Sequence, residues 1–295
     1  MKYVITGSLG HISRPLAQTL LQHGHQVTIV SSNADRAAQI TALGATPAIG
    51  SVEDVAFLTA TFSGADVVYT MVPPTWAATN WKQHIHNIGR NYAQAITAAG
   101  VKNVVNLSSI GAHMPDGCGP VSGLYWVESE LNALEGVDVK HLRPGFFYYN
   151  MLANIGMIKN MGIIGGNYGE NATLVMVHPN DIAAVAAGEM LNPTFTGKSV
   201  RYIASDEVAT QDIARILGAA IGRPDLPWVN FTDADTIGGM VAAGLSHEVA
   251  SNYAEMGSAM ASGQMAADYL VNRPQLSATK FTQFAQEFAA AYSAS

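Results

Sequence analysis

The stretch KYVITGSLGHIS, residues 2–13, decides the fold of this chain. It begins as a short apolar strand and passes into a glycine turn. A helix-like run to residue 23 and a second apolar run at residues 27–30 follow it. A strand, a tight glycine turn, an amphipathic helix and a second strand form the opening βαβ unit of a dinucleotide-binding sheet. The sequence therefore predicts a cofactor site at its very beginning.

Each residue type in the turn has a role in this interpretation. Gly7 permits the turn after the strand, and Gly10 lets backbone amides approach a pyrophosphate, toward which the helix directs its partially positive N-terminus. Ser13 stands where the fingerprint usually has its third glycine. A structural βα turn in a sheet without a ligand is the alternative. The predicted phosphate-binding residues are Gly7, Leu9, Gly10, His11 and Ile12.

Strand and helix signals alternate over about the first half of the chain. Strands are expected at 2–6, 26–30, 45–49, 66–71, 103–108 and 137–143. Helices are expected near 11–23, 34–43, 53–61, 79–99 and 122–135. Alternating βα units with short connections imply an α/β fold, a Rossmann-type, doubly wound parallel sheet with right-handed crossovers.

This rhythm stops after Arg143-Pro144-Gly145. The remainder is helix-rich, with short strand candidates at 174–178, 199–204 and 227–230. We expect a dinucleotide-binding domain at residues 1–150, to which the segment of about 174–204 returns. Residues 151–295 should form a smaller, substrate-binding lobe that closes over the sheet edge.

Composition narrows the function classes. Of 295 residues, 13% are charged and 48% are hydrophobic, and no apolar run reaches the about 18 residues of a membrane span. The net charge of −7 argues against nucleic acid as a partner. The single cysteine, Cys118, excludes an internal disulfide and a cysteine-based metal site. We expect a cytoplasmic protein without membrane contact, and we leave a homodimer open.

Four motifs carry a resemblance to a known family. They are Thr6-Gly7-x-x-Gly10, Leu107-Ser108-Ser109, Leu142-Arg143-Pro144-Gly145-Phe146-Phe147 followed by Asn150, and Asp181-Ile182-Ala183. In this order and spacing, the chain resembles the NmrA-like branch of the atypical short-chain dehydrogenases over roughly residues 1–200. That branch includes NAD(P)H-dependent quinone and azo-dye reductases, isoflavone-reductase-like enzymes, and regulators that bind dinucleotide without turning it over. The resemblance implies fold and cofactor more strongly than reaction.

The end of the second strand favours NADP(H) over NAD(H). NAD-binding proteins usually place an acid there to hold the ribose hydroxyls. Here Ser31, Ser32 and Asn33 can receive a 2′-phosphate, and Arg36 is near enough in sequence to neutralise it. Arg14 is a second candidate cation. Relatives commonly have an arginine where this chain has Ser31, and Arg36 as a solvated helix residue is the alternative.

The remaining cofactor and substrate residues are predicted from the carboxyl ends of the parallel strands, where ligands bind in such sheets. Further cofactor-binding residues are expected at Met71, Val72, Pro73, Ser108, Pro144 and Phe146. For an aromatic, apolar substrate pocket, we expect Trp76, Met114, Trp126, Phe147, Tyr148, Tyr149 and Asn150. Packing between the sheet and the lobe is the alternative role of Phe146 and Phe147. No metal site is expected, because His84 and His86 diverge on one helix.

The proton-transfer residues depart from the short-chain dehydrogenase pattern. That pattern pairs a serine after the fifth strand with Tyr-x-x-x-Lys, whose lysine lowers the pKa of the tyrosine. Ser109 and Tyr125 are present, but Ser129 stands in place of the lysine, and no Lys or Arg occurs between residues 103 and 139. An activated tyrosine is therefore not expected. Ser109, His113 and Tyr125 are predicted to orient a substrate carbonyl, with Tyr125 and Trp126 as pocket walls.

Three functions remain compatible with the sequence. The first is an NADPH-dependent reductase of quinone-like or conjugated aromatic compounds, which transfers hydride directly because the resulting quinolate is itself stabilised. The second is a non-catalytic NAD(P)-binding regulator or redox sensor. A nucleotide-sugar epimerase or dehydratase is third, because such an enzyme would need the missing Tyr-Lys pair.

Overall fold

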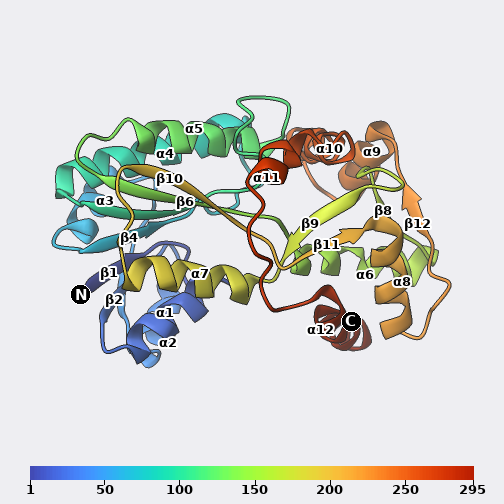
Figure 1. The fold of residues 1–295 in the computed structure, drawn as a ribbon, viewed down its shortest axis with the longest axis horizontal. Coiled ribbons are helices and arrows are strands. Elements are labelled where there is room, and N and C mark those ends of the chain that lie inside the picture. Colours follow the sequence, from blue (N-terminus) through green and yellow to red (C-terminus); the bar gives the residue numbers. More distant parts are fainter.

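A seven-stranded parallel sheet forms the centre of the larger half of the molecule (Figure 1). The computed structural model describes all 295 residues. The strand order is β10-β6-β5-β4-β1-β2-β3, which places β1 in the middle of the sheet. The strands are β1 (Lys2–Ile5), β2 (Gln26–Ser31), β3 (Thr46–Ile49), β4 (Val67–Thr70), β5 (Asn103–Leu107), β6 (Asp138–Pro144) and β10 (Lys198–Ile203).

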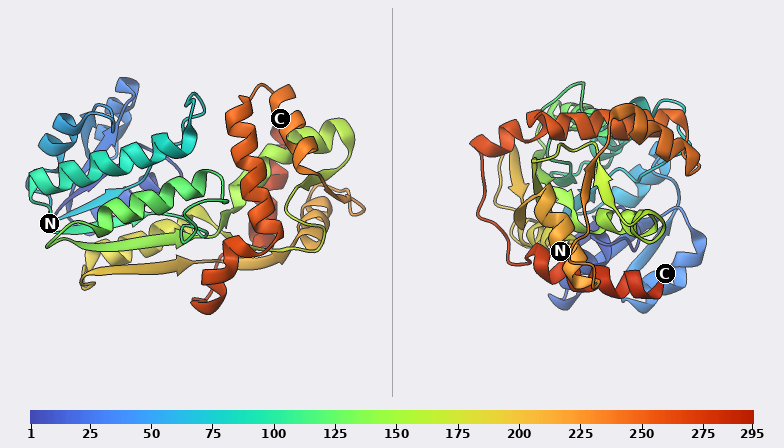
Figure 2. Two further views of the ribbon diagram at one scale, coloured as in Figure 1. Left: turned by 90° about the horizontal axis from the view of Figure 1, so that it is seen from above. Right: turned by 90° about the vertical axis from the view of Figure 1, so that its right-hand side faces the viewer.

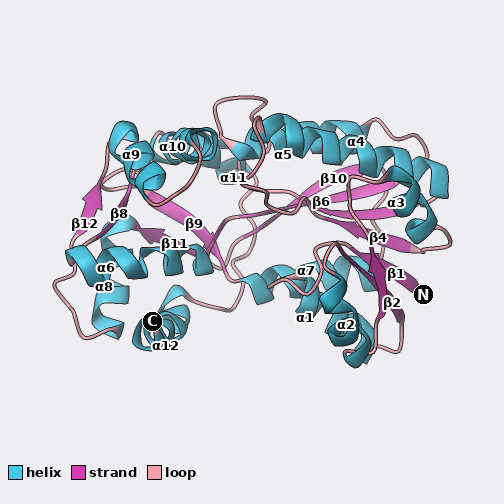
Figure 3. Ribbon diagram, turned by 180° about the vertical axis from the view of Figure 1, so that it is seen from behind, coloured by secondary structure: helices cyan, strands magenta, loops and turns pink.

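Helices cover both faces of this sheet (Figure 3). One face carries α3 (Val55–Phe62), α4 (Trp81–Ala99) and α5 (Pro120–Asn132), and the other carries α1 (Ser13–Gln22), α2 (Ala37–Ala42) and α7 (Pro179–Leu191). The long helices α4 and α5 run side by side across the sheet (Figure 2, left). All four residues of β4 are buried, as expected for a central strand that is enclosed on both faces. None of the helices, including the 19-residue α4, combines the length and apolar composition of a membrane span.

The second half of the molecule is a smaller lobe (Figure 1, right). Its strands make a three-stranded sheet, β11-β9-β7, and a two-stranded sheet, β12-β8. These strands are β7 (Phe146–Phe147), β8 (Ile164–Gly166), β9 (Thr173–Val177), β11 (Asp206–Ala209) and β12 (Trp228–Asn230). Its helices are α6 (Ile155–Met161), α8 (Thr210–Ala220), α9 (Asp233–Ala242), α10 (His247–Ala261), α11 (Ala267–Val271) and α12 (Phe281–Ala294).

The predicted α/β fold class is confirmed, and each expected strand and helix is present within a few residues of its expected position. The return of the chain to the main sheet differs in detail from the expectation. The helix α7 and strand β10 lie with the main sheet, but β9 pairs with β7 and β11 in the lobe. Short strands β7, β8 and β11 are not anticipated by the sequence pattern, because two to four residues carry too little alternation to signal a strand.

A buried ion pair connects the two halves. Arg143 at the end of β6 donates to both carboxylate oxygens of Glu128 in α5, at 2.9 and 2.7 Å. The same guanidinium donates to the Tyr202 hydroxyl and to Asp268 of α11, each at 3.0 Å. One side chain thus joins the sheet, α5 and the lobe.

Candidate functional site

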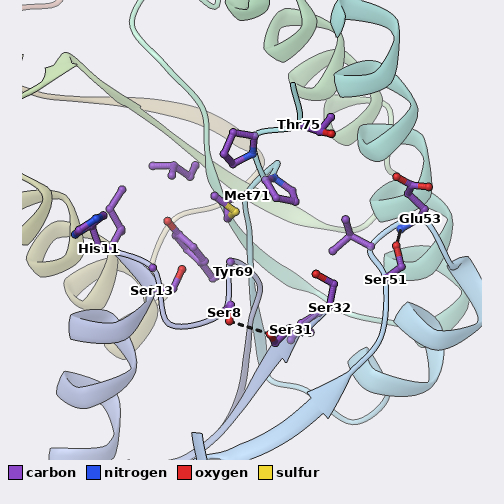
Figure 4. Close-up of a pocket in the computed structure, with 18 of the residues that line it drawn as sticks. Ser8, His11, Ser13, Ser31, Ser32, Ser51, Glu53, Tyr69, Met71 and Thr75 are labelled. Carbon is purple, nitrogen blue, oxygen red and sulfur yellow. Dashed lines mark hydrogen bonds between the residues drawn. The ribbon is translucent and has the colours of Figure 1, made fainter. Parts of the chain in front are cut away.

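A cavity of about 490 Å³ lies along the carboxyl edge of the main sheet (Figure 4). Its walls come from the glycine turn after β1, from the ends of β2, β3, β4 and β5, and from the segment after β6. Figure 4 shows Ser8 and Ser13 of the turn on one side, with Ser32, Ser51 and Glu53 on the other. The cavity therefore runs across the edge where dinucleotides bind in doubly wound sheets.

The glycine turn has no room for a side chain at its first glycine. Gly7 has φ +93°, and a Cβ there would lie 2.6 Å from Ser13 Oγ and 2.9 Å from Met71 Cγ. At Gly10, by contrast, the only close atom is the carbonyl oxygen of Gly7 at 3.1 Å. A side chain at Gly10 would therefore occupy the cavity itself.

Ser13 fulfils the packing role of the third fingerprint glycine. Its side chain is buried, and its hydroxyl donates to the carbonyl of Thr6 at 2.9 Å. A small residue whose polar atom is bonded to the end of β1 keeps the helix close to the sheet. This explains how the turn tolerates Gly-x-x-Gly-x-x-Ser.

Backbone amides at the start of α1 are available for an anion. The N–H groups of Leu9, His11, Ile12 and Ser13 donate to no other group of the protein. The helix cap at Ile12 has no side-chain hydrogen bond. Free amides at the N-terminus of a ten-residue helix attract a negatively charged phosphate. The turn thus has the donors that a dinucleotide diphosphate requires.

Hydroxyl groups and one acid surround the end of β2. Ser8 donates to Ser31 Oγ at 2.9 Å, and Ser32, Ser51 and Glu53 also line the cavity. Glu53 is the only lining residue with a carboxylate or a lysine or arginine cation.

Asn33 and Arg36, which are also predicted to contact a 2′-phosphate, lie outside the cavity that Ser31 and Ser32 line. Asn33 caps the following turn by accepting from the N–H of Asp35 at 2.8 Å, and it does not line the cavity. Arg36 is exposed and donates to Gln39 at 2.9 Å.

The opposite end of the cavity is apolar and aromatic. Phe147 and Tyr149 follow β6, and their ring centroids are 5.5 Å apart. The ring of His11 lies 4.9 Å from that of Tyr149, which joins this wall to the glycine turn. Burial raises the pKa of Tyr149, so its hydroxyl stays protonated. Met71, Pro73 and Leu107 complete an environment suited to a flat ring.

Ser108 contacts the buried ion pair and does not line the cavity. Its hydroxyl donates to Glu128 at 2.5 Å, and neither residue lines the cavity. Ser109 donates to the carbonyl of Ile110 at 2.9 Å, and it also lies outside the cavity. His113 does not line the cavity either, and its buried Nδ1 has no hydrogen-bond partner.

Tyr125 and Trp126 lie on α5 and not in the cavity wall. Trp126 is 41% exposed, and its ring stacks on His86 of α4 at 5.6 Å. The ring of Tyr125 packs edge-on against that of Trp126 at 5.1 Å. The positions of these two residues therefore do not support their interpretation as pocket walls. Both rings lie at the surface between α4 and α5.

Other predicted residues divide between the cavity and the packing around it. Those that line the cavity are Gly7, Gly10, His11, Ile12, Ser31, Ser32, Met71, Pro73, Phe147 and Tyr149. Those outside it are Leu9, Val72, Trp76, Met114, Pro144, Phe146, Tyr148 and Asn150. Tyr148 is fully buried in the lobe, where its hydroxyl donates to the carbonyl of Thr279 at 3.0 Å. Phe146 packs against Tyr168 of the lobe at 5.7 Å, which is the alternative role considered for it.

Sequence reasoning missed several wall residues. The segment Gly50 to Glu53 follows β3, so the carboxyl-edge rule would have found it had it been applied to that strand. His84 lies in the first turn of α4 and lines the cavity, although it looks like an ordinary polar helix residue in the sequence. Tyr69 lies inside β4, where its sequence context indicates only a buried strand. No group of three or more His, Cys, Asp or Glu side chains is arranged to hold a metal ion.

Comparisons with known proteins give the family model and the relatives that this chain resembles. Residues 7–148 match the family model described as NAD(P)H-binding. The (4-alkanoyl-5-oxo-2,5-dihydrofuran-3-yl)methyl phosphate reductase of Streptomyces griseus subsp. griseus is 25% identical over 222 residues, which are 75% of this chain and 74% of the relative.

Two solved structures have the same fold over nearly the whole chain. An NADPH-dependent quinone oxidoreductase from Escherichia coli superimposes with a TM-score of 0.80 at 21% identity, covering 97% of this chain and 98% of that one. The triphenylmethane reductase of Citrobacter sp., in complex with NADP(H), has a TM-score of 0.81 at 17% identity, covering 98% and 100%.

The open space at Gly10 gives a direct test of the diphosphate site. We expect Gly10→Val to fold normally and to lose dinucleotide binding, because its side chain would fill the phosphate position. Calorimetric titration with NADPH measures the loss, and circular dichroism measures the fold. Gly156→Val is the matched control, since Gly156 lies on α6 with no atom within 4 Å of its Cβ position. Parent-like binding by Gly10→Val would show that the diphosphate lies elsewhere.

Proposed function

We propose that this chain, which resembles the NmrA-like branch of the atypical short-chain dehydrogenases, is an NADPH-dependent reductase of quinone-like or conjugated aromatic compounds. At the coarser level it is an NAD(P)H-dependent oxidoreductase, in keeping with relatives that are named reductases. The observation that carries the proposal is a single cavity with free helix-terminal amides at one end and an aromatic wall at the other.

The residues present fit such a cofactor and a flat acceptor. The free amides after Gly10 suit the diphosphate, and Phe147 with Tyr149 suits the stacking of planar rings and the exclusion of water. When bound, NADPH supplies a hydride, that is, one proton and two electrons, for a carbon or oxygen of the conjugated acceptor. A quinone reduced in this way would carry the negative charge and take its proton from water, whereas a cationic dye would become neutral, so the chain needs no strong acid for either acceptor. The raised pKa of Tyr149 leaves its hydroxyl as a neutral donor for the acceptor oxygen.

A regulator that binds dinucleotide without turnover is the second candidate. One observation favours it: Ser109, His113 and Tyr125 all lie outside the cavity, so no proton-relay set is assembled there. Turnover is the property that separates the two candidates.

A panel of acceptors tests the reductase directly. We expect the pure protein to bind NADPH and to oxidise it in the presence of soluble quinones or cationic triarylmethane dyes. The loss of absorbance at the nicotinamide band measures this oxidation. Simple ketones should be poor substrates, because the alkoxide that hydride transfer creates on them needs an acid. Tight NADPH binding with no oxidation by any acceptor would favour the sensor.

The cofactor preference rests on the end of β2. The serines there offer neutral donors to a 2′-phosphate, and Arg36 lies on the adjacent turn, although Glu53 opposes the phosphate charge. We expect NADPH to bind about tenfold more tightly than NADH, because a charge-assisted phosphate contact is worth roughly 1.5–3 kcal/mol. Arg36→Ala should remove most of that ratio, and Glu53→Gln should increase it.

Arg215→Ala is the matched control for Arg36. Arg215 is another exposed arginine that bonds a residue three positions away, but it lies on α8 in the lobe. The affinities of each variant for NADPH and NADH are measured by calorimetry. Equal affinities in the parent, or an unchanged ratio in Arg36→Ala, would refute the role of Arg36.

The position of Tyr125 predicts a small effect of its hydroxyl. We expect Tyr125→Phe to lose tenfold or less in kcat/KM, whereas an essential general acid typically contributes roughly 10²–10⁴-fold. The physical reason is that no lysine or arginine of α5 activates it and that its ring packs on Trp126 outside the cavity. Steady-state kinetics with the best acceptor measure the change. A loss of about a thousandfold would restore the activated-tyrosine mechanism.

A further inference from the structure

The floor of the cavity contains a tyrosine with an unused hydroxyl. Tyr69, in the middle of β4, has 0% exposure and lines the cavity. Its side chain lies between the glycine turn and Met71 (Figure 4). It belongs to the core on the α1 side of the sheet, together with Ile12 and Leu107, which also line the cavity.

The hydroxyl of Tyr69 has no partner within the protein. Other fully buried tyrosines differ in this respect. Tyr3 donates to the carbonyl of Met190 at 3.2 Å, and Tyr92 donates to the carbonyl of Met71 at 2.6 Å. A buried polar group without a hydrogen bond is destabilising, so an unpartnered one at the floor of a cavity indicates a bound group that it meets.

The position of Tyr69 along the sheet identifies the half of the cofactor that it meets. In the strand order, β4 lies on the β5 and β6 side of β1, whereas the ribose serines lie on the β2 and β3 side. A dinucleotide with its diphosphate at Gly7 and Gly10 would direct its adenosine half toward β2 and its nicotinamide half toward β4. The substrate would then stack on the nicotinamide from the lobe side, farther from the sheet.

We propose that the Tyr69 hydroxyl donates a hydrogen bond to an oxygen of the nicotinamide half of the cofactor and positions the ring for hydride transfer. This inference rests on the proposed function, because it takes NAD(P)H as the ligand of the cavity. The oxygen belongs to the carboxamide or to the ribose. Contact requires only an adjustment of the cavity floor, for which the unbranched Met71 side chain is suited.

Tyr69 is a positioning residue and not the proton donor. Burial, with a smaller contribution from Tyr92, raises the pKa of Tyr69 far above its ordinary value. The hydroxyl therefore stays neutral over the working pH range and donates without releasing its proton.

Tyr69→Phe removes this hydroxyl and changes little else. We expect it to weaken NADPH binding about fivefold, which corresponds to about 1 kcal/mol for one neutral hydrogen bond. Binding of 2′,5′-ADP, which contains only the adenosine half, should be unchanged. The melting temperature of the ligand-free protein should be unchanged or higher, since no protein hydrogen bond is lost. Calorimetric titration of both ligands and thermal unfolding measure these three quantities.

Tyr3→Phe is the matched control, because Tyr3 lies in the same core but has a partnered hydroxyl. It should lower the melting temperature and leave both affinities unchanged. The inference is refuted if Tyr69→Phe binds NADPH like the parent, if it weakens both ligands equally, or if it lowers the melting temperature as Tyr3→Phe does. Failure of the parent protein to bind NADPH would instead refute the proposed function.

Discussion

The buried guanidinium of Arg143 is the group on which the relation of the two halves depends, because it pairs with Glu128 inside the main half and with Asp268 of α11 in the lobe. The charges of Arg143 and Glu128 are removed from water, and they are compensated by two direct bonds and by the further contacts of Arg143 with Tyr202 and Asp268. Removing one partner of such a pair typically costs about 3–5 kcal/mol, because the other charge stays buried and uncompensated. Arg143 therefore constrains where α11 and the lobe lie relative to the end of β6. The aromatic wall begins at Phe147, only four residues after Arg143, so the same constraint sets one end of the cavity.

The ion pair also explains the departure from short-chain dehydrogenase chemistry. Glu128 lies three residues after Tyr125, in the helix that usually carries the activating lysine, and it accepts the hydroxyl hydrogen of Ser108 at 2.5 Å. Ser108 and Glu128 thus belong to the buried network, and each is the chain neighbour of a usual relay position, Ser109 and Ser129. A lysine on this turn of α5 would bring a second positive charge toward Arg143. The glycine turn at one end of the cavity keeps the features of a dinucleotide site, while the other end is formed by the walls after β4 and β6.

Sequence predicts the fold better than it predicts the walls of the site. The strand and helix positions follow from local apolar patterns, and Gly7 is recognisable because its φ of +93° suits glycine. The roles of residues after strand ends are harder to predict from sequence. The direction in which a side chain points there depends on packing partners that are distant in the chain. Tyr148 and Tyr149 are adjacent, yet one is enclosed in the lobe and the other lines the cavity. Tyr69 could not be found, because nothing in a strand sequence reveals an unpartnered hydroxyl.

The two ends of the cavity are held by different kinds of groups. The predicted diphosphate contacts are backbone amides, which only a change to proline removes but which a side chain at Gly10 would block. The opposite wall consists of side chains such as Phe147 and Tyr149, whose exchange would alter the pocket without disturbing the turn. Evolution can therefore change the substrate at one end while the cofactor end stays fixed by backbone geometry. For this reason a few glycines predict the fold and the class of cofactor, whereas the acceptor depends on side chains that the packing of the lobe positions.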